Sequence, residues 1–288
     1  MFTPRYFKNF VCTADKCTHS CCIGWEIDID EDTLAYYQSL PAPLCKKILK
    51  TIQITAEGAH FALGKDKRCK NLDKRGLCRI HKALGHEGLC DICREHPRFY
   101  HDTDREEVGL GAACEAAAAL ILASDGYTDF VCIDGDAAPI PLATDFNPRA
   151  EREALYTLLA DRTRPLSARL ADLAARYGGA KVLPLNKLEY LEEAHRALFQ
   201  NALGAHAQGA TSDAVYERFF AYLIYRHAST TKTAAEFSRA VRMALSLLPL
   251  FRGLITAEGL SPVRAAVTIS EEIEYSEDNT TLLLQEMA

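Results

Sequence analysis

The sequence predicts a mainly α-helical protein in which an irregular, cysteine-rich N-terminal metal-binding domain precedes a C-terminal helical bundle. Ten of the 11 cysteines lie at or before Cys114, and only Cys132 follows. From residue 148 onwards, apolar residues recur at spacings of three and four, which is the helical period. Residues 126–150 hold prolines, glycines and aspartates without a sustained period, so we expect the boundary there. The predicted domains are residues 1–132 and 133–288.

The composition is that of an ordinary globular protein apart from its cysteines. Hydrophobic residues make up 48% of the 288 residues, and the formal net charge is -6. This acidic balance disfavours a nucleic-acid surface, which needs a basic stripe. No stretch approaches the roughly 18 apolar residues of a membrane span, and the N-terminus lacks the apolar run of a secretory signal. We therefore expect a cytoplasmic protein that binds neither nucleic acid nor membranes.

Short regular segments interrupt the N-terminal part. Residues 24–30 alternate apolar and acidic side chains, which predicts a half-buried strand. Its acidic residues Glu26, Asp28 and Asp30 would form a solvated face, although an acidic edge also suits a lysine substrate. Helices are expected at residues 31–40, 45–55 and 112–123. In the C-terminal part, helices are expected at residues 148–162, 166–179, 187–203, 212–228, 233–255 and 261–275.

The cysteines are expected to be metal ligands, because thiols in the cytosol stay reduced and bind soft or borderline metals strongly. The two-residue gap between Cys90 and Cys93 lets both sulfurs reach one metal or two adjacent irons. The candidate ligands, of which four or more would bind, are Cys12, Cys17, Cys21, Cys22, Cys69, Cys78, Cys90, Cys93 and Cys114. His19 and His81 are alternative ligands or hydrogen-bond donors to the ligands.

Spacing alone leaves zinc and an iron–sulfur cluster both open. Two tetrahedral zinc sites would use eight ligands at about four each, whereas a 4Fe-4S cluster needs about four cysteines and tolerates irregular spacing. The remaining thiols, Cys45 and Cys132, lie in apolar surroundings and are expected to be packed in the core.

Five segments carry a resemblance to a known family: RYFKNFVCTADKCTHSCCIGWEIDID, CKNLDKRGLCRIHKALGHEGLCDICREHPRF, GLGAACEAAAALIL, YERFFAYLIYRH and ISEEIEYSEDNTTLL. They resemble the flagellin lysine-N-methylase family, within the wider group of proteins that carry a cysteine-rich, zinc- or iron-chelating domain. Where the family commonly has Cys-Pro-Glu, this chain has Cys114 followed by Glu115 and Ala116. The resemblance implies a protein with a 4Fe-4S cluster that transfers methyl groups from S-adenosylmethionine to surface lysines of flagellin.

Residues that would bind S-adenosylmethionine are harder to locate, because the chain lacks the strand, glycine-rich loop and helix of the doubly wound methyltransferases. Gly111 precedes a predicted helix and is one candidate contact. Trp25 offers an aromatic face for a cation, and Arg94 and Arg98 offer partners for the cofactor's carboxylate. The competing interpretations are that Trp25 is a core residue and that the arginines only cap the metal turn.

The sequence leaves both a radical and a polar mechanism of methyl transfer open. The cysteine spacing does not match the loop of a radical enzyme, and a polar transfer needs a base that no sequence motif identifies. The sequence therefore names no catalytic residue. The alternative to an enzyme is a non-catalytic zinc- or iron-binding module for protein interaction.

Overall fold

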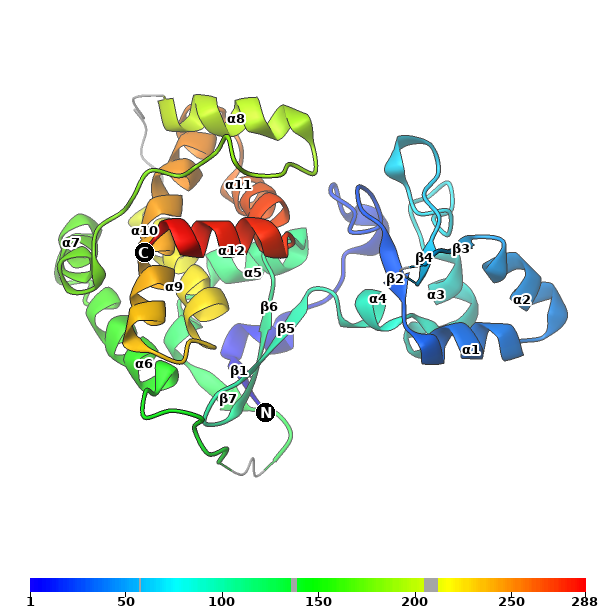
Figure 1. Cartoon of the computed structure of the whole chain (residues 1–288), viewed down its shortest axis with the longest axis horizontal. Coiled ribbons are helices and arrows are strands. Elements are labelled where there is room, and N and C mark those ends of the chain that lie inside the picture. The colour runs from blue at the N-terminus through cyan, green and yellow to red at the C-terminus, as the bar shows by residue number, and fades with distance from the viewer. Residues whose placement is uncertain (57, 136–138, 205–211) are drawn as a thin grey trace. The chain divides into compact units, whose positions relative to one another are not determined.

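The structure is a computed structural model that describes residues 1–56, 58–135, 139–204 and 212–288. Helices hold 55% of the chain and strands 11%, which confirms the prediction of a mainly helical protein. The chain forms two compact units (Figure 1). We call Val11–Pro97 the cysteine unit, and Met1–Phe10 together with Arg98–Ala288 the helical unit.

These units differ from the expected division at residue 132, because the segment after Pro97 pairs with the N-terminus. The helical unit contains a four-stranded sheet in the order β5-β6-β1-β7. Its strands are β1 (Phe2–Pro4), β5 (Arg98–Asp102), β6 (Glu106–Leu110) and β7 (Phe130–Cys132). Strand β1 runs parallel to β6, with Phe2 opposite Glu107, and antiparallel to β7. Sequence analysis predicted none of these strands. Residues 136–138 of the expected boundary segment lie outside the described residues.

In the helical unit, α10 packs against α7, α8, α9, α11 and α12, while α5 and α6 pack against α9 (Figure 1). Their bounds are α5 (Glu115–Ala123), α6 (Pro148–Leu159), α7 (Leu166–Tyr177), α8 (Glu193–Gly204), α9 (Asp213–Ala228), α10 (Ala234–Thr256), α11 (Pro262–Ile269) and α12 (Glu277–Glu286). In the core, the rings of Phe219 and Phe251 stack with centroids 4.0 Å apart.

Most of the helices predicted in this unit are confirmed, and two need correction. Residues 187–192 precede α8 and are not helical. The segment predicted as one helix over 261–275 is α11 followed by a π-helical turn, Ser270–Glu274. Helix α12 was not predicted. Side chains that accept a backbone N–H begin several of these helices, including Asn147, Thr233 and Ser261.

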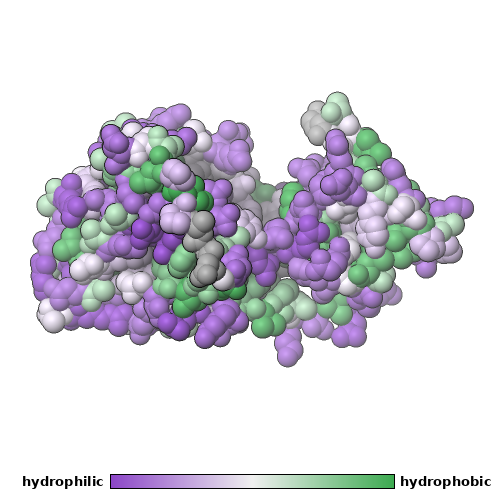
Figure 2. All heavy atoms as spheres, turned by 90° about the horizontal axis from the view of Figure 1, so that it is seen from below, coloured by the Kyte–Doolittle hydropathy of each residue, from purple (hydrophilic) through white to green (hydrophobic). Residues whose placement is uncertain are grey.

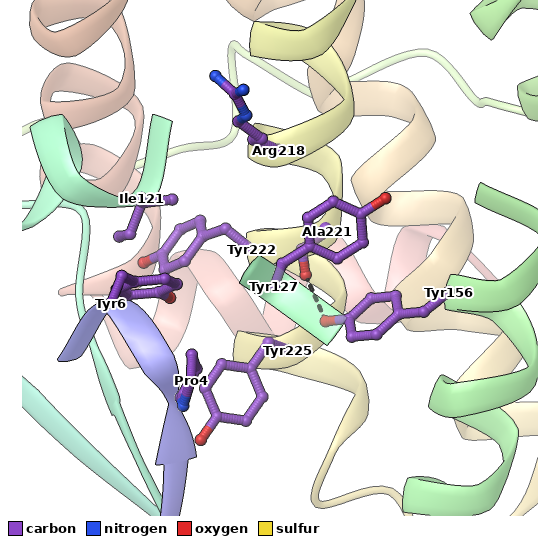
Figure 3. A pocket seen from close by; sticks show the side chains of 9 residues that line it. All are labelled: Pro4, Tyr6, Ile121, Tyr127, Tyr156, Arg218, Ala221, Tyr222 and Tyr225. Atoms are coloured by element: carbon purple, nitrogen blue, oxygen red, sulfur yellow. Dashed lines mark hydrogen bonds between the residues drawn. The ribbon is translucent and has the colours of Figure 1, made fainter. Parts of the chain in front are cut away.

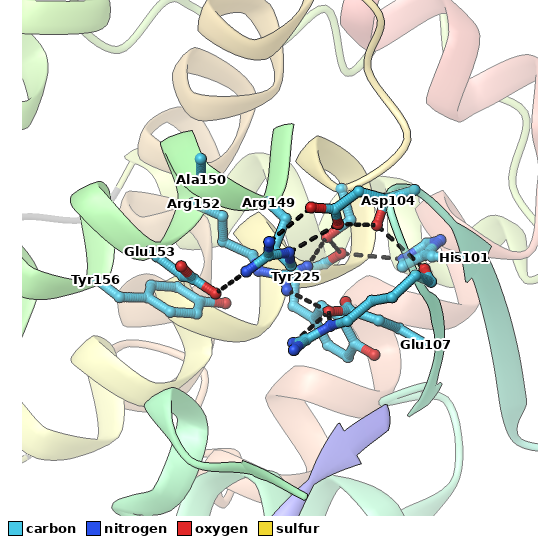
Figure 4. A network of polar contacts seen from close by, with 12 residues as sticks. His101, Asp104, Glu107, Arg149, Ala150, Arg152, Glu153, Tyr156 and Tyr225 are labelled. Atoms are coloured by element: carbon cyan, nitrogen blue, oxygen red, sulfur yellow. Dashed lines mark hydrogen bonds and ion pairs between the residues drawn. The ribbon is translucent and has the colours of Figure 1, made fainter. Parts of the chain in front are cut away.

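Buried ion pairs fasten the sheet of the helical unit to its helices (Figure 4). The Glu107 carboxylate on β6 accepts from Arg152 of α6 at 2.8 Å, and both side chains are almost fully buried. Beside this pair, both oxygens of Asp104 accept from Arg149, at 2.7 and 2.6 Å. The Arg149 guanidinium holds the pKa of Asp104 well below its usual range. The turn between β5 and β6 is therefore clamped to the start of α6.

A second buried carboxylate, Glu217 of α9, connects three segments. It accepts from Arg162 at 2.9 Å, from Arg169 at 2.6 Å and from the Tyr127 hydroxyl at 2.9 Å. Burial raises the pKa of Glu217, but these hydrogen bonds more than compensate and hold the pKa below its usual value. The carboxylate therefore stays charged within the helical core.

The cysteine unit combines a small antiparallel sheet, in the order β2-β4-β3, with four short helices. The strands are β2 (Ile27–Ile29), β3 (Ile52–Ile54) and β4 (Ala59–Phe61), and the helices are α1 (Glu31–Ser39), α2 (Ala42–Leu49), α3 (Arg79–Leu84) and α4 (Asp91–Glu95). Strand β2 confirms the predicted alternation, because Asp28 is exposed between buried Ile27 and Ile29. Glu26 and Asp28 thus lie on a solvated face, whereas Asp30 is partly buried.

The helix predicted over residues 45–55 is wrong beyond Leu49. Ile52 and Ile54 flank Gln53 in strand β3, where Ile52 pairs with Phe61 of β4. Two β-branched residues in alternation favour a strand once a partner strand is available.

No helix in the described ranges is long and apolar enough to cross a membrane. In the view of Figure 2, hydrophilic residues predominate on the surface, and hydrophobic residues form small groups among them.

The Glu217 network gives a prediction about stability. Glu217→Leu leaves the buried guanidinium of Arg169 without its carboxylate, so we expect the free energy of unfolding to fall by about 3–5 kcal/mol. The control is Asp172→Asn, which breaks an exposed pair with Arg164 and should cost less than about 1 kcal/mol. Urea denaturation measures both, and equal losses in the two variants would contradict a structural role for the Glu217 network.

Candidate functional site

Five cysteine side chains gather in the core of the cysteine unit. Cys69 and Cys90 are buried there, and Cys22, Cys78 and Cys93 are partly buried against the same core. All five are free thiols rather than disulfides. These residues, which we call the thiol cluster, bring together five of the nine predicted metal ligands.

Backbone contacts place these thiols near one another. The N–H of Cys69 donates to the carbonyl of Cys22 at 2.9 Å, and a β-bridge joins Leu72 to Cys78. Cys78 and Cys90 each occupy the position just before a helix, α3 and α4 respectively. Cys93 follows on the single turn of α4, so the two-residue gap after Cys90 brings both sulfurs to one side, as the spacing predicts.

The thiols also influence one another electrostatically. The hydrogen bond between Cys90 and Cys93 lowers the pKa of Cys90 and raises that of Cys93, which retains the shared proton. A hydrogen bond with Cys21 lowers the pKa of Cys22 to about 7. Burial raises the pKa of Cys69 to about 11. Because the charges of Cys22 and Cys78 also act on Cys93, the sulfurs share one small region.

Residues around the thiol cluster hold its segments in place. The Tyr37 hydroxyl of α1 donates to the carbonyl of Gly88 at 2.9 Å. Asp30 accepts from the N–H of Thr33 at 2.8 Å and from that of Asp91 at 2.9 Å, so one carboxylate begins both α1 and α4. Burial and the nearby thiols raise the pKa of Tyr37.

The other predicted ligands lie elsewhere. Cys12 is exposed, and its sulfur accepts from the N–H of Ala14 at 3.4 Å. Cys17 is partly buried and donates to the carbonyl of His19 at 2.7 Å. Cys21 is also partly buried, next to Cys22. Cys114 belongs to the helical unit, where it precedes α5.

Two cysteines predicted to lie in the core, and one histidine considered as a ligand, are more exposed than expected. Cys132 is exposed at the end of the edge strand β7, where its thiol donates to the carbonyl of Gly135 at 2.6 Å, so its prediction as a core thiol is wrong. Cys45 is only partly buried on α2. His81 is exposed on α3 and packs its ring against His86.

The thiol cluster fits a metal in its donor chemistry. Five reduced sulfurs within one core are the ligands that zinc and iron–sulfur clusters take. Over the described ranges, no group of three or more Cys, His, Asp or Glu side chains already has the geometry of a metal site. Binding would therefore require the thiols to lose their protons and turn toward a common centre.

The predicted cofactor contacts fall in both units. In the cysteine unit, Trp25 is partly buried and its indole N–H donates to the carbonyl of Cys21 at 3.0 Å, while Arg94 pairs with Asp91 within α4. In the helical unit, the guanidinium of Arg98 lies 5.8 and 5.7 Å from the ring centroids of Phe7 and Phe10. Gly111 lies in the turn between β6 and α5.

Sequence analysis missed a cluster of buried carboxyls on the π-helical turn Ser270–Glu274. Glu271, Glu272 and Glu274 are each less than a tenth exposed. Glu272 accepts from the N–H of Leu191 at 2.7 Å and from the His195 ring at 2.5 Å. Local pattern did not reveal them, because acidic residues in ISEEIEY are ordinarily expected at the surface. A π-helical turn is rare and often marks a functional position.

Glu274 connects this turn to the loop that contains Gly111. Its carboxylate accepts from His227 at 2.9 Å and from the Tyr222 hydroxyl at 2.5 Å. The Tyr222 oxygen in turn accepts from the N–H of Ala112 at 2.9 Å. Tyr222 also lines a tyrosine-rich cavity (Figure 3) of about 10 Å³. That volume admits about one water molecule and no cofactor.

Glu271 differs from its neighbours in the direction of its pKa. Burial raises the pKa of Glu271 to about 8; the positive charge of Arg264 opposes this rise, and the negative charges of Glu272 and Glu192 add smaller contributions to it. The carboxyl is therefore mostly protonated at neutral pH and able to exchange a proton there.

This pKa predicts a pH dependence of stability. Between pH 4.5 and 8, folded Glu271 holds a proton that the unfolded chain has released, so stability falls as the pH rises through this window. Glu271→Gln, which stays neutral, should remove this part of the decline. Urea denaturation at a series of pH values between 4.5 and 8 measures the free energy of unfolding, and Glu277→Gln, at an exposed position, is the control. A decline as steep in Glu271→Gln as in the original protein would contradict the raised pKa.

Comparison with known proteins identifies relatives from Salmonella. The chain is 31% identical over 130 residues to the flagellar biosynthetic protein FliU of Salmonella muenchen. The matched region covers 41% of this chain and 75% of FliU. It is equally similar to the lysine-N-methylases of Salmonella choleraesuis strain SC-B67 and Salmonella typhimurium strain LT2. The match spans only 31% of the length of each methylase.

No family model and no solved structure matches the chain. The relatives confirm the resemblance that the sequence motifs carry. Since the match covers 75% of FliU at 31% identity, the chain belongs to the family of FliU and the lysine-N-methylases.

Proposed function

We propose that the protein is a lysine N-methyltransferase that uses S-adenosylmethionine to methylate surface lysines of flagellin. The observation that carries this proposal is the 31% identity to two lysine-N-methylases. The name of the third relative, a flagellar biosynthetic protein, supports flagellin as the substrate. The site of action we propose is cytoplasmic.

We further propose that the cysteine unit binds a 4Fe-4S cluster. Cys22, Cys78, Cys90 and Cys93 would hold it, because their thiols act electrostatically on one another within one core. Cys69 lies in the same core and would be a fifth thiol beside them. Such a cluster would supply a redox-active or Lewis-acidic iron. The same four sulfurs also suit a tetrahedral zinc ion, which is the alternative metal.

In polar methyl transfer, the chain's own residues must bind a lysine and remove its proton. A lysine attacks a methyl group only as the neutral amine, so a nearby group has to accept that proton. A carboxyl with a pKa of about 8 suits this task better than an ordinary glutamate, and Glu271 has that pKa. Glu272 and Glu274 are fixed by hydrogen bonds from His195, Tyr222 and His227, so they hold the π-helical turn in place.

A second candidate function is a non-catalytic zinc- or iron-binding module for protein interaction. One observation favours it: the match spans only 31% of each methylase. A relative that shares this part with the methylases carries a name that states no catalytic activity.

Methylation of flagellin tests the proposal directly. Protein purified without oxygen is incubated with purified flagellin and labelled S-adenosylmethionine, and flagellin peptides are analysed by mass spectrometry. We expect methyl groups on flagellin lysines. If flagellin gains none while the metal content is intact, the enzyme assignment fails and the binding module is favoured.

The matched variants for this experiment are Cys93→Ser and Cys132→Ser. Loss of a ligand sulfur should lower metal content and soluble yield together in Cys93→Ser, because metal binding and folding are coupled. Cys132 is exposed in the helical unit, so Cys132→Ser should keep the metal content of the original protein. Absorbance distinguishes the metals, since an iron–sulfur protein is coloured and a zinc protein is colourless. Equal metal content in the two variants would refute the assigned ligands.

A further inference from the structure

A pocket of about 490 Å³ lies in the cysteine unit, apart from the thiols themselves. Its size is within the range of small-molecule sites, roughly 300–1,000 Å³. Helices α2 and α3 supply most of its lining, which consists of Leu44, Lys47, Ile48, Thr51, Asn71, Arg79, Ile80 and Ala83. No step of the proposed methyl transfer uses these residues.

One part of the pocket wall is apolar. Ile48 and Ile80 are 4% and 2% exposed, and both belong to the core that contains the thiol cluster. Leu44 is partly buried against the same core, and Ala83 is exposed at the edge of the pocket. These side chains offer a hydrophobic surface of fixed shape to the uncharged part of a ligand.

Another part of the wall is polar and rigid. Asn71 is 4% exposed, and its amide donates to the Thr51 hydroxyl at 3.0 Å. The Thr51 hydroxyl lies 2.6 Å from the carbonyl of Ile48, at the end of α2. The carbonyl of Asn71 accepts from the N–H of Arg79 at 2.8 Å, which fixes the start of α3. The two helices therefore keep their positions without a ligand.

Two cations line the pocket, one from each helix. Lys47 comes from α2 and Arg79 from α3. Arg79 donates one N–H to the carbonyl of Lys70 at 2.9 Å, which leaves the rest of its guanidinium available. Across the described part of the chain, neither cation lies within ion-pair distance of a carboxylate, whereas the neighbouring Lys82 and Arg75 pair with Asp73 and Asp15.

The surrounding charge also favours an anion. Residues 65–82 contain eight lysines and arginines against two aspartates. A concentration of one sign of charge beside a pocket raises the local concentration of ligands of opposite sign. The unpaired cations of the pocket thus lie next to the most basic stretch of the cysteine unit.

We propose that this pocket binds a small organic anion. The anionic group lies between Lys47 and Arg79, whose guanidinium offers paired N–H donors to a carboxylate or phosphate. The uncharged part of the ligand lies against Ile48 and Ile80. The proposal is independent of methyl transfer and of the choice between zinc and iron proposed for the thiol cluster.

Pyridoxal 5′-phosphate is a suitable probe, because it combines a phosphate with an aromatic ring and an aldehyde. The aldehyde condenses with a neutral lysine amine and loses water, and borohydride reduces the imine to a stable amine. Full-length protein is labelled at increasing probe concentrations, and tandem mass spectrometry compares Lys47 with its neighbour Lys46. We expect saturable labelling of Lys47, about tenfold faster than that of Lys46, the factor that one charge-assisted contact supplies.

Variants of the protein and a probe without the phosphate test whether the pocket causes the preferential labelling of Lys47. Arg79→Gln should slow labelling of Lys47 about tenfold, whereas Arg75→Gln, which removes an exposed arginine outside the pocket, should not. Ala83→Phe keeps both cations but fills the pocket, so it should abolish the preference for Lys47. Pyridoxal, which lacks the phosphate, should label Lys47 and Lys46 at similar rates.

The proposal is overturned if pyridoxal 5′-phosphate labels Lys47 and Lys46 equally in the original protein. It is also overturned if Arg79→Gln and Arg75→Gln have the same effect, or if pyridoxal prefers Lys47 as strongly as its phosphate does. Circular dichroism and metal content of each variant are compared with those of the original protein, so that a folding defect is recognised. If Arg79→Gln does not fold, the comparison of Ala83→Phe with the original protein decides.

Discussion

The convergence of five thiols in one small core is the constraint on which the cysteine unit depends. Its strands of three residues and helices of five to nine residues each bury little apolar surface, so its core is built largely from loops and helix ends. The thiols come from loops and helix starts that are far apart in sequence, from Cys22 to Cys93. A metal held by them would join all of these segments at once.

The helical unit depends on different interactions. Its core is apolar and large, and buried carboxylates such as Glu107 and Glu217 connect its elements through arginines. Such pairs add little net stability but penalise any arrangement that separates them. The π-helical turn belongs to this framework, since Glu272 and Glu274 are held by hydrogen bonds while Glu271 keeps a pKa of about 8.

The sequence predicted what depends on local pattern and missed what depends on distant partners. Helical periodicity identified most helices after residue 148, and the Cys90 and Cys93 spacing identified a thiol pair. Ile52 and Ile54 form a strand only because β4 lies beside them, and the expected helix there was wrong. The strands after Pro97 pair with the N-terminus, which no local pattern reveals. Burial of the carboxyls on Ser270–Glu274 likewise depends on contacts from other helices.

The central claim is that a thiol-bound metal holds the cysteine unit together, and hydrogen exchange of the full-length protein tests it most directly. Exchange is followed by mass spectrometry before and after the metal is removed by a chelator. The account predicts that backbone protection is lost throughout Val11–Pro97 while α9 and α10 keep theirs. Unchanged protection in Val11–Pro97 after complete metal removal, or protein that is purified without any metal and is equally protected, would contradict it.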